Sequence, residues 1–179
     1  MKEMPNVLWL EEIKKEDIIS VGGKGGASLG EMTAIGLPVP KAFVVTAQAF
    51  RRFLIETGIE EELFRKLERL DVDDNGALES VAKEVQEIVL SVEMPDHLRQ
   101  DIVEAYDRMG ANGTVVAVRS SATAEDLPDA SFAGQQETFL NILGGEIDLL
   151  DAVQRCWASL YGARASTTGQ NRGGSTTGA

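Results

Sequence analysis

Apolar residues recur along most of the chain at spacings that predict helices separated by a few short strands. Spacings of three and four residues predict helices, whereas short β-branched or aromatic runs predict strands. The helical pattern covers residues of about 46–58, 60–70, 78–90, 95–110 and 147–165. The strand-like runs are Val7–Leu10, the stretch 38–46, Val115–Arg119 and Thr138–Ile142. The pattern therefore predicts a domain that mixes helices with strands.

One strand-like run ends in an arginine. The apolar residues before Arg119 predict a buried strand, and a polar loop containing Pro128 and Gly134 follows. A guanidinium at a strand end, next to a glycine-containing loop, is a common way to hold phosphate, because it presents a planar fork of donors and stays charged. A surface arginine after a core strand has the same pattern. Both interpretations stay open on this stretch alone.

A second candidate segment is the glycine-rich stretch Val21–Gly30, which surrounds Lys24. So many glycines disfavour a helix interior, since each costs about 1 kcal/mol relative to alanine. We therefore expect a loop that opens a helix ending near Ile35, with Gly36 as its stop. Backbone N–H groups and one ammonium at a helix N-terminus form an anion-binding arrangement.

Two named phosphate motifs do not fit this glycine-rich stretch. A Walker A loop would need a glycine at Ile18 and a serine or threonine at Gly25, and the dinucleotide fingerprint would need a glycine at Ser28. The alternative to a phosphate loop is a loop whose glycines allow close helix packing, with Gly26 and Gly30 one helical turn apart.

Composition narrows the classes of function. The 179 residues suffice for one well-cored domain, and the formal net charge of −12 argues against a nucleic-acid or anionic-membrane surface. We expect a cytoplasmic protein, since we find neither a membrane-spanning run nor a signal-peptide core. Cys156, the single cysteine, is predicted to be a buried, inert thiol.

Two further candidate sites are predicted to have no functional role. The segment Asp71–Gly76 faintly resembles a calcium loop, but Ala82 stands where the bidentate glutamate belongs, so we interpret it as a turn. His97 lies at the start of a predicted helix without a catalytic partner motif, and we do not expect it to act in catalysis.

Taken together, the two candidate loops resemble the N-terminal ATP-binding domain of the phosphoenolpyruvate synthase and pyruvate phosphate dikinase family. The matching blocks follow the family's order, and the resemblance covers nearly everything from Val7 to Ala165. The segments Arg-Ser-Ser-Ala-Thr-Ala-Glu-Asp and Phe-Ala-Gly-Gln are closer to phosphoenolpyruvate synthase than to the dikinase. Rifampicin phosphotransferases and starch water dikinases share the module. The blocks are 21–32, 36–40, 43–46, 116–126, 131–139 and 156–161.

The resemblance implies an α/β (α+β) fold, the first subdomain of an ATP-grasp-like domain with a mixed sheet flanked by helices. In the full-length enzymes, ATP and Mg²⁺ bind between two subdomains, and ATP phosphorylates a histidine on a separate domain. A third domain binds pyruvate, which becomes phosphoenolpyruvate, with AMP and phosphate as the other products. The implied partners are therefore ATP and these two domains, with no nucleic acid and no membrane.

The resemblance also implies roles for individual residues. Lys24 and Arg119 would be the catalytic residues that neutralise the ATP phosphates, close together at an open cleft. Ser131, Gly134 and Gln135 belong to a loop that would close over the β- and γ-phosphates. No metal ligand is predicted here, because the family's acidic magnesium ligands belong to a half of the domain that this sequence does not match.

The family pattern stops after Ala165, and the remaining residues contain no apolar side chain larger than alanine. We therefore assign residues 1–165 to the ATP-binding domain and expect 166–179 to be a disordered tail, possibly non-native. One hypothesis is a fragment of an ATP-dependent phosphotransferase, inactive alone. The other is a stand-alone, non-catalytic nucleotide-binding or regulatory module. In either case uncovered apolar surface could promote self-association.

Overall fold

A computed structural model describes residues 4–17, 21, 24–68, 75–110, 115–120, 138–143 and 146–170. The α/β class is confirmed. Within these residues the strands form two separate two-stranded antiparallel sheets, β1 with β2 and β3 with β4. The helices and strands are β1 Val7–Trp9, α1 Lys24–Ala34, β2 Phe43–Val45, α2 Ala47–Glu56, α3 Glu60–Glu68, α4 Asn75–Ser91, α5 Asp96–Gly110, β3 Val115–Arg119, β4 Thr138–Leu143 and α6 Glu146–Gln170.

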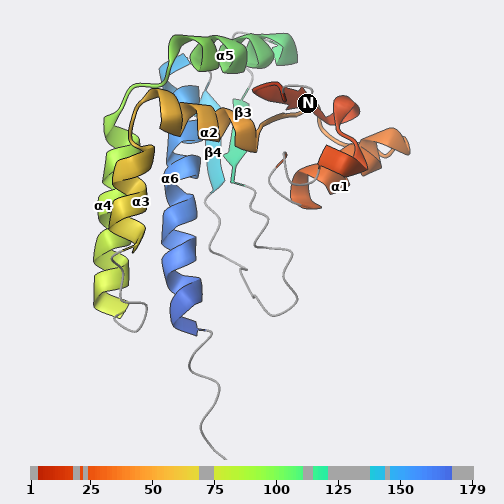
Figure 1. The fold of residues 1–179 in the computed structure, drawn as a ribbon. Helices are drawn as coiled ribbons and strands as arrows, with labels where there is room; N and C mark the ends of the chain where they lie inside the picture. The colour runs from red at the N-terminus through yellow and green to blue at the C-terminus, as the bar shows by residue number, and fades with distance from the viewer. Residues whose placement is uncertain are drawn as a thin grey trace, which may run out of the picture.

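Helix α6 is the centre of the arrangement. It packs along α4 on one side and against β3 and β4 on the other, while α3 packs on α4 (Figure 1). Helix α5 runs across the end of these elements, and α1 lies on the side away from α4 (Figure 1). Helices α3 and α4 therefore form one layer, α6 forms the next layer, and the β3–β4 sheet packs on the other side of α6.

Aromatic side chains join α2 to α6. The Phe50 and Phe53 rings lie 5.2 and 5.0 Å from the Trp157 ring, between centroids. Tyr161, one turn further along α6, meets Phe50 edge-on at 6.4 Å. Phe53 is fully buried, and such rings supply a large part of a core's hydrophobic stabilisation. Cys156 is buried beside Trp157, as predicted.

The β1–β2 sheet is tied to α2 and α5 by polar contacts. Thr46 caps α2 by accepting from the Ala49 N–H, and its own hydroxyl donates to the Pro5 carbonyl at 2.8 Å. The buried Asn6 side chain accepts from Arg52 and donates to Asp101 on α5 at 2.7 Å. These contacts fix the chain before β1 against two helices.

The β3–β4 sheet is covered on one face only. Val116, Val118 and Ile142 face the core, whereas Val115 is 51% exposed and Leu140 is 65% exposed. The strand before Arg119, which was predicted to be buried, is therefore covered on one face only. The run Val-Val-Ala-Val alternates between two faces, which is the usual geometry of an antiparallel strand.

Helix α1 begins earlier than the glycine content suggested. It starts at Lys24, so the glycines after Lys24 belong to the helix. Gly30 explains part of this, since a Cβ there would lie 3.1 Å from both the Leu10 carbonyl oxygen and the Ile13 Cβ. Close packing on the 3₁₀ turn Leu10–Glu12 (η1) stabilises a helix that propensity alone disfavours. The close-packing alternative is thus confirmed at Gly30.

The predicted helix ends agree with the structure at two glycines and differ at the last helix. Gly36 and Gly58 have φ of 79° and 73°, and Leu37 N–H donates to the Met32 carbonyl as in a Schellman motif. Helix α6 continues to Gln170, five residues past the predicted helix end at Ala165. Extending an existing helix costs far less than nucleating one, so polar residues can follow an apolar helix. Residues 171–179 lie outside the described part.

Candidate functional site

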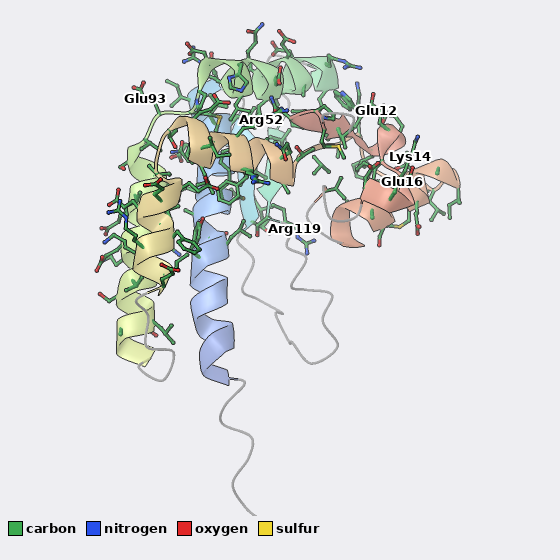
Figure 2. The ribbon with its side chains drawn as sticks, viewed as in Figure 1. Glu12, Lys14, Glu16, Arg52, Glu93 and Arg119 are labelled. Atoms are coloured by element: carbon green, nitrogen blue, oxygen red, sulfur yellow. The ribbon has the colours of Figure 1, made fainter. Side chains whose placement is uncertain are left out.

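Arg119 is the last residue of β3, at the end of the sheet where the described part of that strand pair stops. It pairs with Thr138, the first residue of β4, so the two strands leave the sheet together. Its side chain extends from the end of β3 away from α6, on the side where α1 lies (Figure 2). The antiparallel pairing thus fixes the position of the Cα atom and leaves the guanidinium exposed.

Arg119 shares its sheet face with apolar residues. Side chains alternate along a strand, so Val115 and Ala117 lie on the face of Arg119, and all three are exposed. Leu140 on β4 is also exposed. This outer face, defined as Val115, Ala117, Arg119 and Leu140, is an apolar strip with one cation at its end. Such a combination suits a ligand with a flat apolar part and an anionic part.

The inner face and the residue after Arg119 hold this strip in place. Ser120 is buried at 6% exposure, as the alternation along β3 requires for the residue after the exposed arginine. On β4, the Phe139 ring lies 5.6 Å from the Arg155 guanidinium of α6, and Arg155 forms an ion pair with Asp151 at 3.3 Å. The register shifts between the pairs Val116–Ile142 and Val118–Phe139, so the extra residue of this irregularity lies on β4.

The exposure of the outer face was not predicted from the sequence, although the residue pattern of β3 contains a signal for it. The period of two in Val115–Arg119 places Val115 and Ala117 on the same sheet face as the arginine, but an all-apolar run also predicts a buried strand. Such runs predict burial of both faces unless the layers that pack against the sheet are known.

Lys24 is the first residue of α1, so the helix begins at the lysine itself, inside the stretch that was predicted to be a loop. The first backbone N–H groups of a helix lack intrahelical partners and carry partial positive charge. The structure describes the backbone of Lys24 but not its side chain. The predicted proximity of Lys24 and Arg119 therefore stays a prediction.

The remaining predicted contacts, Ser131, Gly134 and Gln135, lie outside the described residues. The residues 18–20, 22–23 and 121–137, which would flank Lys24 and Arg119, lie outside them too. The described part therefore contributes one side of the candidate site, the outer face of the β3–β4 sheet with Arg119.

Other polar groups in the described part do not form a competing catalytic site. His97 lies at the surface, with its Nε2 atom 3.5 Å from a Glu56 carboxylate oxygen. Among the described residues, we find no cluster of three or more His, Cys, Asp or Glu side chains that could hold a metal ion. None of the described helices combines the length and the apolar character needed to cross a membrane.

Comparison with known families identifies the class. A sequence model of the family "Pyruvate phosphate dikinase, AMP/ATP-binding domain" matches residues 18–176, and the chain belongs to this family. The match includes both Lys24 and Arg119, the residues that the resemblance singles out.

Curated relatives narrow the class further. The chain is 50% identical over 168 residues to a probable phosphoenolpyruvate synthase of Methanothermobacter thermautotrophicus, covering 92% of this chain and 24% of the relative. It is 50% identical over 166 residues to the probable phosphoenolpyruvate synthase of Methanocaldococcus jannaschii, covering 90% and 14%. It is 48% identical over 164 residues to the phosphoenolpyruvate synthase of Aeropyrum pernix, covering 89% and 20%.

The chain therefore spans less than a quarter of the length of these relatives. Within that span it covers the N-terminal ATP-binding domain of phosphoenolpyruvate synthase-like proteins.

Proposed function

We propose that this chain supplies the phosphate-binding side of the ATP site in a phosphoenolpyruvate synthase-like phosphotransferase. The observation that carries the proposal is the exposed Arg119 at the end of β3, on the apolar outer face, in a chain of the AMP/ATP-binding family. The adenine ring of ATP is flat and can pack on apolar side chains, whereas the triphosphate is anionic. An apolar strip ending in a guanidinium has the matching polarity.

In this proposal Arg119 and Lys24 share the phosphate charge. Phosphoryl transfer needs little covalent chemistry from the protein, so positioning and electrostatic stabilisation provide most of the catalysis. A guanidinium presents two parallel N–H donors to phosphate oxygens. Lys24 would add an ammonium and the α1 N-terminus. Ser131, Gly134 and Gln135 would cover the β- and γ-phosphates through backbone and side-chain donors.

Magnesium needs ligands from elsewhere. Mg²⁺ prefers an octahedral set of oxygens, usually carboxylates, phosphates and water. Among the described residues, no three or more His, Cys, Asp or Glu side chains are placed so that they could hold a metal ion together, so these residues do not fit a magnesium site by themselves. We therefore assign this chain the nucleotide contacts and no step that passes through the metal.

The whole reaction would follow that of the named relatives. ATP would phosphorylate a histidine on a separate domain, and pyruvate on a third domain would become phosphoenolpyruvate, with AMP and phosphate released. The ATP-grasp architecture and a cytoplasmic location are parts of the same proposal. Alone, the chain would bind ATP weakly and transfer nothing. A stand-alone regulatory nucleotide-binding module would use the same contacts without the transfer.

Calorimetric titration with ATP, with and without Mg²⁺, tests the site. We expect a dissociation constant of about 1 mM or weaker for the unmodified chain, because part of the ligand would stay uncovered. Arg119→Ala should weaken binding about tenfold, which corresponds to about 1.4 kcal/mol. Arg119→Lys should fall between the two, since it keeps the charge but loses the fork.

The matched control is Arg65→Ala. Arg65 is an exposed arginine on α3 that donates to the Glu61 carbonyl, and it lies outside the proposed site. It removes the same charge, so it should leave ATP affinity unchanged. Equal affinities for Arg119→Ala and Arg65→Ala would remove Arg119 from the ATP site.

A further inference from the structure

A groove of about 820 Å³ lies beside β1. One wall is the stretch from Met4 to Trp9, and the other includes Asp101, Glu104 and Arg108 from one face of α5. Figure 1 shows β1 beneath α5. The size falls within the range of roughly 300–1,000 Å³ that bound ligands occupy in proteins.

The groove borders the free edge of β1. Consecutive residues from Met4 to Trp9 line it, although their side chains alternate between the two faces of the sheet. Such a lining is expected where a groove runs along an edge and not over a face. On its other edge β1 pairs with β2.

The hydrogen-bond pattern shows which backbone groups point into that edge. Thr46 N–H donates to the Asn6 carbonyl, and Leu10 N–H donates to the Ala42 carbonyl. In an antiparallel pair the bonded positions alternate, so Val7 and Trp9 direct their backbone groups away from β2. The Trp9 N–H is bonded to the Glu12 carboxylate at 3.0 Å. Within the described part, the Val7 N–H and carbonyl have no partner.

The charges around the groove are mainly negative. Glu12, Lys14 and Glu16 lie on the segment after β1, beside α1 (Figure 2). Five carboxylates and two cations line the groove, and no ion pair joins a carboxylate to a cation among these described residues. The carboxylates are Glu12, Glu16, Asp17, Asp101 and Glu104, and the cations are Lys14 and Arg108.

We propose that this groove binds an extended segment of a partner protein that carries lysine or arginine at alternate positions. The segment adds to β1 as a third strand, with main-chain bonds to the Val7 N–H and carbonyl providing register. Its cationic side chains meet the carboxylates on α5 and on the segment after β1. Alternation suits the geometry, because every second side chain of an added strand points to the same side.

The charge decides against two other occupants. A second copy would bring another acidic groove and another net charge of −12, so the two grooves would repel each other. ATP is itself anionic, so its phosphates would be repelled here and attracted by Arg119. The groove is therefore independent of the proposed ATP site.

Fluorescence anisotropy with labelled heptapeptides tests the proposal on the whole chain. The probe alternates lysine and valine, with both ends blocked. We expect a dissociation constant on the order of 10–100 µM for this weak class of contact. A glutamate–valine peptide tests the charge, and a lysine–valine peptide with alternate backbone nitrogens methylated tests the main-chain bonds. Each should bind at least tenfold more weakly than the probe.

Protein variants locate the binding. The double variant Glu16→Gln, Glu104→Gln should weaken the lysine–valine peptide about tenfold, since each exposed ionic contact is worth up to about 1 kcal/mol. The matched control is Glu93→Gln together with Glu87→Gln, two surface carboxylates outside the groove, which should change affinity less than twofold. All four positions are at the surface, so folding should survive.

The results that would overturn the proposal are specific. Equal weakening in the control variant would mean attraction to the overall negative charge only. Unchanged binding of the methylated peptide would exclude strand addition. No binding of the probe, or a dimer whose formation needs the same groove residues, would also overturn it.

Discussion

The two strand pairs of this chain are built in different ways. In β1–β2, Trp9 is buried, and Lys41 and Arg108 lie over its ring at 5.3 and 4.8 Å. In β3–β4 one face packs on α6 and the other is exposed, with Leu140 at 65%. The β1–β2 pair packs among the helices and braces them against one another, whereas the β3–β4 pair leaves one of its faces exposed. The proposed ATP site uses the pair that leaves one face exposed.

The largest effect that separates the two pairs is expected from their large side chains. Trp9→Ala should lower the free energy of unfolding by about 3–5 kcal/mol, because it removes a buried ring and leaves a cavity. Leu140→Ala should change it by less than about 0.5 kcal/mol, since that side chain is largely exposed. Urea denaturation measures both. Similar losses for the two variants would contradict the division into brace and surface.

The next largest effect on stability concerns the Asn6 hydrogen bonds, which join the chain before β1 to α2 and α5. Asn6→Ala should cost about 2–3 kcal/mol, because a buried side chain that joins Arg52 to Asp101 is lost and both charged partners lose a bond. Asp101→Asn keeps an acceptor for Asn6 and should cost under about 1 kcal/mol. The same denaturation assay compares the two variants. A larger loss of stability for Asp101→Asn than for Asn6→Ala would mean that the charge of Asp101, and not its hydrogen bond to Asn6, stabilises this contact.

A smaller effect tests the packing of α1 beside β1. Gly30→Ala should destabilise the chain by about 1–2 kcal/mol, because overpacking against Leu10 and Ile13 exceeds the gain in helix propensity. Ser28→Ala on an exposed position of the same helix should be neutral or slightly stabilising. Thermal unfolding of both variants gives the sign. Stabilisation by Gly30→Ala would mean that the contact with η1 is loose.

The smallest effect concerns the attachment of β4 to α6. Arg155→Ala should lower the free energy of unfolding by about 0.5–1 kcal/mol, since it loses a partly exposed contact with the Phe139 ring and a surface ion pair. Arg155→Lys should keep most of this. A loss comparable to that of Trp9→Ala would show that β4 is braced as firmly as β1.

Much of the fold could be predicted from local patterns. The N-cap at Thr46 and the helix ends at Gly36 and Gly58 follow from residue types that have few alternatives in those conformations. The start of α1 at Lys24 could not be predicted, because packing of Gly30 on Ile13 overrides helix propensity. The Asn6 contacts to Arg52 on α2 and Asp101 on α5 join residues that are separated by 46 and 95 positions in the sequence. No local pattern shows such contacts.

The candidate site was predictable only in part. Arg119 is where the sequence pattern indicated, at a strand end. The exposure of the strand's second face depends on which layers cover it, and that is a property of the tertiary arrangement. Ser131, Gly134 and Gln135 rest on the family resemblance alone and stay predictions.

The most direct test of the account is an NMR titration of the ¹⁵N-labelled chain with ATP. If the outer face of β3–β4 carries the phosphate site, the amide signals of Arg119, Thr138 and the first turn of α1 should shift together. Arg119→Ala should remove those shifts while the rest of the spectrum stays folded. Shifts confined to other elements, or shifts at Thr138 that persist in Arg119→Ala, would contradict the account.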